Sequence, residues 1–189
     1  MKKISFKDIF VPTISLFLIC IVVSALLAGT NELTKGPIAE IQAQTAADAM
    51  KSVCSEAETC EGEAGLEIEV YRGIDSAGNV VGYAIPSAYK GYGGDIEVMV
   101  GIDLEGRVTG VEILSHEETP GLGANCTKEA FTDMYRQPAP DGFSVVKDGT
   151  GGESGRIDAL TGATITSNAV TQAVNKALDI YNSLEGGGN

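Results

Sequence analysis

The feature that most constrains this chain is an uninterrupted apolar run near its amino terminus. Residues 9–28, IFVPTISLFLICIVVSALLA, contain no charged side chain. A helix of about 20 residues, at ~1.5 Å per residue, reaches about 30 Å, which is the thickness of the hydrocarbon core of a bilayer. The run can therefore span a membrane, and the folded domain has to be built from the residues that follow it.

The charges that flank this run are unequal. Lys2, Lys3 and Lys7 precede it, whereas Glu32 follows it. By the positive-inside rule, this asymmetry predicts a cytoplasmic amino terminus, residues 1–8, and an extracytoplasmic location for the domain. A cleaved signal peptide is the alternative, because the run ends in small residues. The run is longer than the apolar segment of a typical signal peptide, which favours a retained single-pass anchor.

The charge balance of the chain is strongly acidic. It has 13 Lys and Arg residues against 26 Asp and Glu residues, a formal net charge of −13. An acidic surface repels nucleic acid and anionic lipid headgroups, so neither is predicted as a ligand. Acidic charge also keeps an exported domain soluble, so the charge alone identifies no partner.

Four cysteines allow more than one interpretation. Cys20 lies in the apolar run, Cys126 stands alone, and Cys54 and Cys60 lie close together in an acidic segment. Two close cysteines outside the cytoplasm could form a small-loop disulfide, or they could remain free thiols. A metal site would need further ligands, and the only histidine, His116, is far away in sequence. No metal site is predicted.

Hydrophobic periodicity predicts the elements that follow the apolar run. A helix over residues 31–53, interrupted at Gly36 and Pro37, should lead into a polar loop, so that residues 29–64 form a helical linker and an acidic loop. Alternating and short apolar segments predict strands, and 3.6-residue periodicity predicts helices. The first expected strands are residues 66–74 and 78–89, the second of which should end at Pro86. A hairpin is expected over residues 95–114, with its turn at 103–106, and two further strands at 143–148 and 156–160. The expected helices are residues 127–137 and 167–184.

This order of elements predicts the fold class. Strands that follow one another through short turns form an antiparallel sheet, and the two helices must pack on it, which gives an α+β domain. Glycine accounts for 24 of 189 residues, about 13% against the usual ~7%, as expected for a turn-rich domain. We place this domain at residues 65–185, with a flexible tail at 186–189.

A cluster of hydroxyl side chains precedes the last helix. The segment DALTGATITS, residues 158–167, has four of them beside a Gly-Ala step, but no histidine, cysteine or lysine. A hydrolase would need a base, and a Walker-type phosphate loop would need a lysine. A helix start offers backbone N–H groups to a phosphate, and small residues allow close approach. The segment is therefore either a phosphate site, with Thr166 or Ser167 capping the helix, or a plain helix cap after a tight turn.

Two motifs in this order resemble one protein family. DALTGAT resembles the D-x-x-[ST]-G-A-T motif of the FMN-binding domain found in the RnfG component of the bacterial Rnf electron-transport complex and in its counterpart in the sodium-translocating NADH:quinone reductase. Residues 115–126, SHEETPGLGANC, resemble the family's H-x-E-T-P-G-L-G loop, which lies against the flavin, and residues 91–114 resemble the preceding hairpin. With the single amino-terminal span, the resemblance covers nearly the whole chain and is closer to the Rnf component.

The resemblance implies a role for individual residues. FMN would be bound covalently through a phosphoester to Thr164, and no catalytic residue is expected because the flavin carries the redox chemistry. The same motif supplies further implied cofactor-binding residues. Asp158 would orient the motif, and the turn would be shaped by Thr161, Gly162 and Ala163. Thr166 and Ser167 would cap the helix and reach phosphate oxygens. In the other loop they are Glu118, Thr119, Gly121 and Leu122. His116 is expected to anchor this loop.

The function that the resemblance implies is electron transfer. The chain would be a membrane-anchored component of an ion-translocating ferredoxin:NAD oxidoreductase complex in the bacterial cytoplasmic (inner) membrane. It would relay electrons between neighbouring redox subunits, and a separate flavin transferase would attach the FMN. Two alternatives remain open at this point: an FMN-binding electron donor to another extracytoplasmic reductase, and a non-redox scaffold module in which the motif is only a helix cap.

Overall fold

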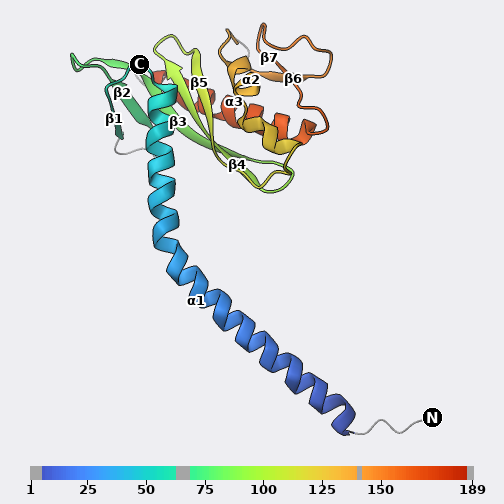
Figure 1. Cartoon of the computed structure of the whole chain (residues 1–189). Coiled ribbons are helices and arrows are strands. Elements are labelled where there is room, and N and C mark those ends of the chain that lie inside the picture. Colours follow the sequence, from blue (N-terminus) through green and yellow to red (C-terminus); the bar gives the residue numbers. More distant parts are fainter. Residues whose placement is uncertain (1–5, 63–68, 140–141, 187–189) are drawn as a thin grey trace. The chain divides into compact units, whose positions relative to one another are not determined.

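A computed structural model describes residues 6–62, 69–139 and 142–186 of the chain. The chain divides into two compact units, Met1–Gln44 and Thr45–Asn189. Figure 1 shows the elements of both. The start of the expected strand over residues 66–74, the lysines at positions 2 and 3, and most of the expected tail at 186–189 lie outside the described residues.

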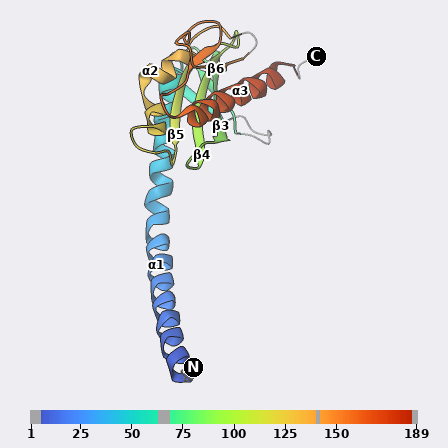
Figure 2. The ribbon, with the colours of Figure 1, turned by 90° about the vertical axis from the view of Figure 1, so that its right-hand side faces the viewer.

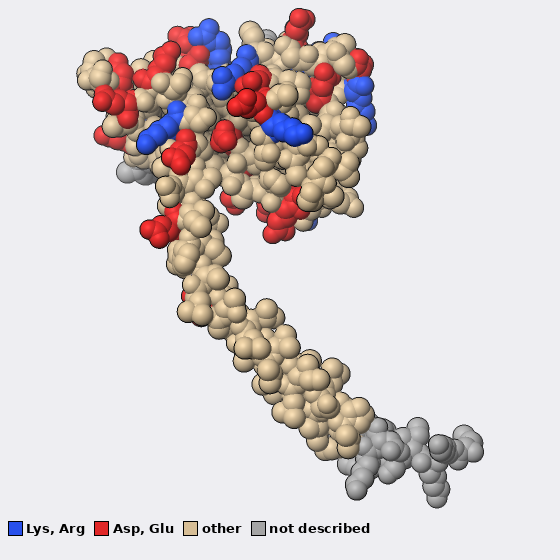
Figure 3. Space-filling model, viewed as in Figure 1, with Lys and Arg blue, Asp and Glu red and all other residues tan. Residues whose placement is uncertain are grey.

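The first unit is formed by helix α1, Phe6–Val53, which continues into the second unit. Large apolar side chains of the apolar run are exposed, and Leu16 and Phe17 keep 64% and 63% of their surface accessible. In Figure 3 the visible face of the lower part of this helix carries no charged side chain. By length and composition the helix can cross a membrane, as the sequence predicts.

The expected interruption of this helix is absent. Helix α1 runs through Gly36 and Pro37 without a break, so that prediction was wrong. A proline inside a helix removes one backbone hydrogen bond and costs about 3 kcal/mol or more, but it does not have to end the helix. The residues after it, 39–51, are rich in alanine, glutamine and other good helix formers, which favour continuation.

The second unit is built on a five-stranded antiparallel sheet. Its order is β1-β2-β3-β4-β5, and this confirms the predicted α+β fold. The strands are β1 (Thr59–Gly62), β2 (Tyr71–Ile74), β3 (Val80–Lys90), β4 (Asp95–Asp103) and β5 (Val108–Ser115). The hairpin of β4 and β5 closes where the sequence predicts it, since the Gly106 N–H donates to the Asp103 carbonyl at 3.1 Å and Gly106 has a φ of 77°.

Strand alternation divides the core between the two faces of the sheet. In β4, Val98 and Val100 belong to the large cluster that includes the buried side of helix α3 (Thr164–Gly186). Met99 between them packs with Ala49 and Val53 of the last turns of α1. Successive side chains of a strand point to opposite faces, so one strand contributes to both clusters. Figures 1 and 2 show α3 lying along the sheet.

Two strand predictions were wrong for the same reason, that pairing depends on distant segments. Strand β3 does not end at Pro86, which pairs in register with Met99. Pairing of β3 with β2 stops at Ala84, so Pro86 lies where β3 has only β4 as a described partner. A proline is tolerated on such a free strand side. Residues 59–62, expected in a loop, form β1 because they pair with β2.

The remaining elements are short. The short helix expected over residues 127–137 is present over residues 129–135, as α2 (Glu129–Thr132) followed directly by η2 (Asp133–Tyr135). It begins two residues later than predicted, because Lys128 is extended, with a ψ of 136°, and separates it from a preceding 3-10 helix, η1 (Gly123–Thr127). The other two expected strands are confirmed as β6 (Ser144–Val146) and β7 (Arg156–Asp158), which form a separate parallel pair.

All four cysteines are free thiols. Cys54 is buried and Cys60 is half-buried. Burial, with a smaller effect of the Cys60 thiol, raises the pKa of Cys54 to about 12, so the Cys54 thiol is protonated at neutral pH. Among the described residues, no cluster of three or more potential ligands could hold a metal ion.

Candidate FMN site

The two sequence motifs meet at one cavity of the second unit. It has a volume of about 530 Å³ and lies between the loop over residues 116–123 and the start of α3. We call it the Thr164 cavity. Its lining residues are Tyr92, Glu118, Thr119, Leu122, Gly123, Gly162, Ala163, Thr164, Ile165 and Thr166. Seven of the predicted site residues are among them.

A tight turn places Thr164 at the start of α3. The Ala163 N–H donates to the Leu160 carbonyl at 2.9 Å, and Gly162 in this turn has a φ of 74°, which favours glycine. Thr164 is the first residue of the helix, and its side chain is half-buried at the cavity. The first N–H groups of a helix lack partners within the helix and carry a positive partial charge, so this position suits a phosphate.

Ser167 stabilises this turn from inside the helix. Its hydroxyl accepts a hydrogen bond from the Leu160 N–H at 2.9 Å and donates to the Ala163 carbonyl at 3.0 Å. Ser167 is fully buried and does not line the cavity. Because α3 begins at Thr164, neither Thr166 nor Ser167 is its N-cap, and that part of the prediction was wrong. Local spacing identified the helix start but placed it too late.

A buried carboxylate joins three segments around the cavity. Glu118 is only 6% exposed. Its Oε1 accepts hydrogen bonds from the backbone N–H groups of Tyr92 at 2.7 Å and Gly93 at 3.2 Å, and its Oε2 accepts one from the Thr166 hydroxyl at 2.8 Å. The loop over residues 116–123, the turn between β3 and β4, and the first turn of α3 are thereby connected.

These contacts keep Glu118 ionised. Burial opposes ionisation, but the hydrogen bonds from Thr166, Gly93 and Tyr92 and the nearby His116 together outweigh it and lower the pKa of Glu118. The negative charge is stabilised by donors that the fold supplies. Both oxygens of the carboxylate are therefore already engaged by the protein.

The other predicted residues lie outside the cavity lining. His116 anchors its own loop, because its Nδ1 accepts a hydrogen bond from the Glu118 N–H at 3.2 Å. Gly121 is exposed in a turn with a φ of 80°. Asp158 accepts a hydrogen bond from the Gly151 N–H at 3.1 Å through Oδ1, and Thr161 is exposed in the turn before α3.

Three lining residues were missed by the sequence analysis. Tyr92 and Ile165 are exposed, at 72% and 55%; Tyr92 lies outside both motifs, and Ile165 is an apolar residue among the hydroxyl side chains of the second. Gly123 is buried beside Glu118 and Thr166, and a side chain there would collide with both. The sequence signal for Tyr92 was the surrounding GYGG, because glycines on both sides of one aromatic residue mark a turn that presents it.

The Thr164 cavity fits FMN by its chemistry. Its volume lies within the ~300–1,000 Å³ that is usual for small-molecule sites. Its lining includes a helix start, a hydroxyl and a glycine without a side chain, which suit a phosphate. It also includes Leu122, Ile165 and Tyr92, which suit contact with a flat aromatic ring system.

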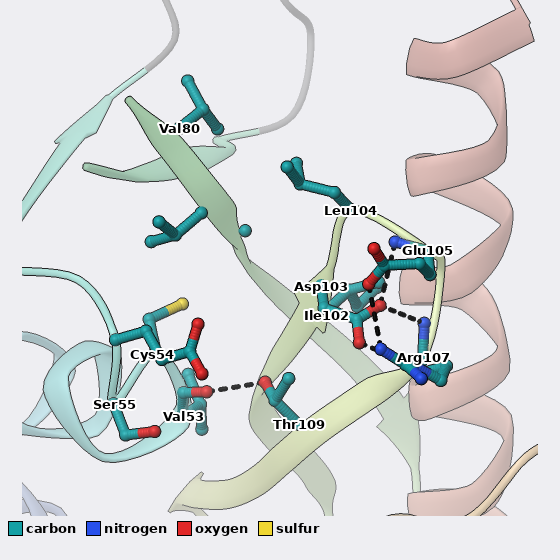
Figure 4. A pocket seen from close by; sticks show the side chains of 13 residues that line it. Val53, Cys54, Ser55, Val80, Ile102, Asp103, Leu104, Glu105, Arg107 and Thr109 are labelled. Carbon is teal, nitrogen blue, oxygen red and sulfur yellow. Dashed lines mark hydrogen bonds and ion pairs between the residues drawn. The ribbon is translucent and has the colours of Figure 1, made fainter. Parts of the chain in front are cut away.

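A second cavity, of about 290 Å³, contains none of the predicted site residues. It is lined by the end of α1 and by the β4–β5 turn (Figure 4). Arg107 is held there by Asp103 at 2.8 Å and Glu105 at 2.9 Å, and the Thr109 hydroxyl donates to the Val53 carbonyl at 2.7 Å. The two ion pairs lie within the β4–β5 turn, and the hydrogen bond joins β5 to the end of α1, so these contacts serve to stabilise the fold.

Comparison with known families agrees with this site. The FMN-binding domain family matches residues 91–179, which include both motifs, and the RnfG N-terminal region matches residues 1–53. The protein therefore combines an amino-terminal apolar helix with an FMN-binding domain.

Relatives that match along nearly the whole chain define the family more closely. The chain is 34% identical to the RnfG-type component of the proton-translocating ferredoxin:NAD(+) oxidoreductase complex of Clostridium ljungdahlii, over 96% of each chain. It is 36% identical to the corresponding component of the Na(+)-translocating ferredoxin:NAD(+) oxidoreductase complex of Acetobacterium woodii, also over 96% of each. The chain belongs to the RnfG family of ion-translocating oxidoreductase complexes, as its motifs predict.

A solved structure supports the fold. The crystal structure of Shewanella oneidensis NqrC aligns with a TM-score of 0.50 at 21% identity, over 68% of this chain and 67% of that one. At this identity the likeness concerns the fold alone.

Proposed function

We propose that this protein is the membrane-anchored electron-transfer component of an ion-translocating ferredoxin:NAD oxidoreductase complex, and that it carries FMN bound covalently to Thr164 through a phosphoester. The observation that carries the proposal is the convergence of both family motifs on one cavity, with the Thr164 side chain at its wall and at the start of α3.

Different residues of the cavity would bind different parts of the cofactor. The Thr164 hydroxyl would form the phosphoester, and the first N–H groups of α3 would stabilise the remaining phosphate charge. Gly162 leaves space for the phosphate, while Leu122 and Ile165 would contact the ring. When bound, FMN supplies the redox chemistry, and the protein binds and orients it.

The site has little that would act on a diffusing substrate. The only carboxylate that lines the Thr164 cavity within the described residues, that of Glu118, is engaged by three donors. General acid–base catalysis needs a group free to exchange a proton with the substrate. The site is therefore suited to electron relay rather than to substrate turnover.

The apolar run of α1 would be the anchor. By the positive-inside rule, the lysines before it favour an amino terminus in the cytoplasm of a bacterium and a domain on the outer side of the cytoplasmic membrane. The partners there would be the other redox subunits of the complex, together with a flavin transferase that modifies the exported domain. Similarity to RnfG relatives along both α1 and the domain favours this complex over a different extracytoplasmic reductase.

A denaturing gel tests the covalent bond. Full-length chain produced with a flavin transferase should show flavin fluorescence after denaturation. Thr164→Ala should abolish the fluorescence, Thr164→Ser should retain it, and Thr161→Ala is the matched control that keeps it. Fluorescence that persists in Thr164→Ala would contradict the assignment of Thr164.

A further inference from the structure

Tyr92 is an unusual lining residue of the Thr164 cavity. It lies in the turn between β3 and β4, which is closed by a hydrogen bond from the Gly91 N–H to the Gly94 carbonyl at 2.8 Å. Its side chain is 72% exposed although it borders the cavity. A large aromatic side chain left in water at the edge of a ligand cavity has apolar surface that a bound ligand could cover.

The backbone of this turn is fixed by Glu118 from the opposite loop. The carboxylate accepts hydrogen bonds from the N–H groups of Tyr92 and Gly93. It can approach this closely because Gly91 has no side chain, and a Cβ there would collide with Oε1 of Glu118. Glu118 therefore determines where the Tyr92 side chain leaves the turn.

The same carboxylate is tied to the segment that carries Thr164. Its other oxygen accepts a hydrogen bond from the hydroxyl of Thr166, which is 1% exposed in the first turn of α3. Gly123 also leaves room for this contact. The position of Tyr92 is thus coupled to the attachment residue through one buried side chain.

From these contacts we infer that Tyr92 is a further flavin-binding residue, which covers the isoalloxazine ring from solvent, and that Glu118 is a positioning residue that acts through Tyr92. The inference rests on the proposed function. It also changes the role expected for Glu118, whose carboxylate oxygens are occupied by protein donors rather than left free for the ring.

Solvent access to the bound flavin tests both roles. The full chain, loaded with FMN in a host that provides a flavin transferase and purified in detergent, is titrated with acrylamide, a neutral quencher of flavin fluorescence. Tyr92→Ala should raise the quenching constant severalfold, whereas Tyr92→Phe, which retains the aromatic ring, should leave it near the wild-type value.

The Glu118 variants separate positioning from a general loss of structure. Glu118→Ala removes all three acceptor contacts and should raise access as much as Tyr92→Ala does. Glu118→Gln keeps an amide oxygen for the two N–H groups and should preserve low access. If Glu118 acts through Tyr92, the double variant Tyr92→Ala/Glu118→Ala should show no more access than either single variant, because residues that act through one another are not additive.

The outcomes are distinguishable. Wild-type access in loaded Tyr92→Ala would overturn the covering role, and fully additive effects in the double variant would overturn the positioning role of Glu118. Wild-type protein without covalent flavin would instead contradict the proposed function and, with it, this inference. Unfolding of the flavin-free chain is the additional control, since Glu118→Ala should lower its stability and Tyr92→Ala should not.

Discussion

At the scale of single residues, Glu118 connects three segments of the site. It is a charged side chain in a buried position, and burial of an unpaired charge would be strongly unfavourable. Three hydrogen bonds, from Tyr92, Gly93 and Thr166, make the position tolerable. The sequence motif predicted that Glu118 belongs to the site, but its partners could not be predicted, because Tyr92 lies 26 positions away and is brought near only by the fold.

The lowered pKa of Glu118 has a consequence for stability. Between its folded and unfolded pKa values, the unfolded chain binds the proton and the folded chain does not, so a falling pH favours unfolding. The stabilising contribution of Glu118 is complete above its unfolded pKa and is lost as the pH falls through its folded pKa.

Urea unfolding as a function of pH measures this effect. Glu118→Gln cannot titrate, so its free energy of unfolding should fall less than that of the wild type as the solution is acidified. The pKa values of Asp75 and Asp148 are also lowered, and these two carboxylates affect the pH dependence of stability equally in both proteins. Parallel pH curves for the two proteins would show that Glu118 is not ionised in a stabilising position.

At the scale of elements, the sequence correctly predicted the helices and strands whose stabilising contacts lie close together in the chain. The β4–β5 hairpin was predicted correctly because its alternation and its turn residues are contiguous. Helix α3 was predicted because its buried residues, among them Val170, Val174 and Tyr181, follow the helical period. Strand β1 could not be predicted, because residues 59–62 have no apolar alternation and depend on pairing with the later β2.

The loop over residues 116–123 contains two glycines, and a different physical constraint favours glycine at each position. Gly121 has a φ of 80° and open space around it. Gly123 is packed against the Glu118 side chain and would bring a Cβ to 2.6 Å from the Thr166 hydroxyl oxygen. Position 121 is therefore restricted by its backbone conformation and position 123 by its neighbours.

Substitution by alanine should distinguish the two positions. Gly121→Ala should cost about 1–2 kcal/mol of stability through backbone strain, and Gly123→Ala about 1–3 kcal/mol through overpacking. Only Gly123→Ala should displace Glu118 and so increase acrylamide access to the bound flavin. Equal access in both variants would show that the contact between Gly123 and Glu118 does not affect the flavin site.

At the scale of the whole molecule, the two units differ in the surface that they present. The apolar run of α1 exposes large hydrophobic side chains, whereas the visible face of the domain carries many acidic and some basic side chains (Figure 3). Sequence composition predicted this division well, because membrane spanning depends on length and hydropathy alone. It could not predict the pairing of β6 with β7 as a separate sheet, which depends on tertiary packing.

Removal of residues 1–30 should yield a soluble, acidic domain. The hydrophobic core and most of the charge follow these residues, and a high net charge keeps a protein in solution. Size-exclusion chromatography without detergent should give a single folded species with a cooperative melting transition. A folded domain that still requires detergent would reveal a second membrane-facing surface.

The central claim, covalent FMN at Thr164, is tested most directly by peptide mass spectrometry of the flavin-loaded chain. A phosphoester adds the mass of FMN less one water to the peptide that contains it. We predict this increment on a single peptide, with fragment ions that assign it to Thr164 and not to Thr161, Thr166 or Ser167. An unmodified Thr164, or an increment located on any of the other three residues, would contradict the account.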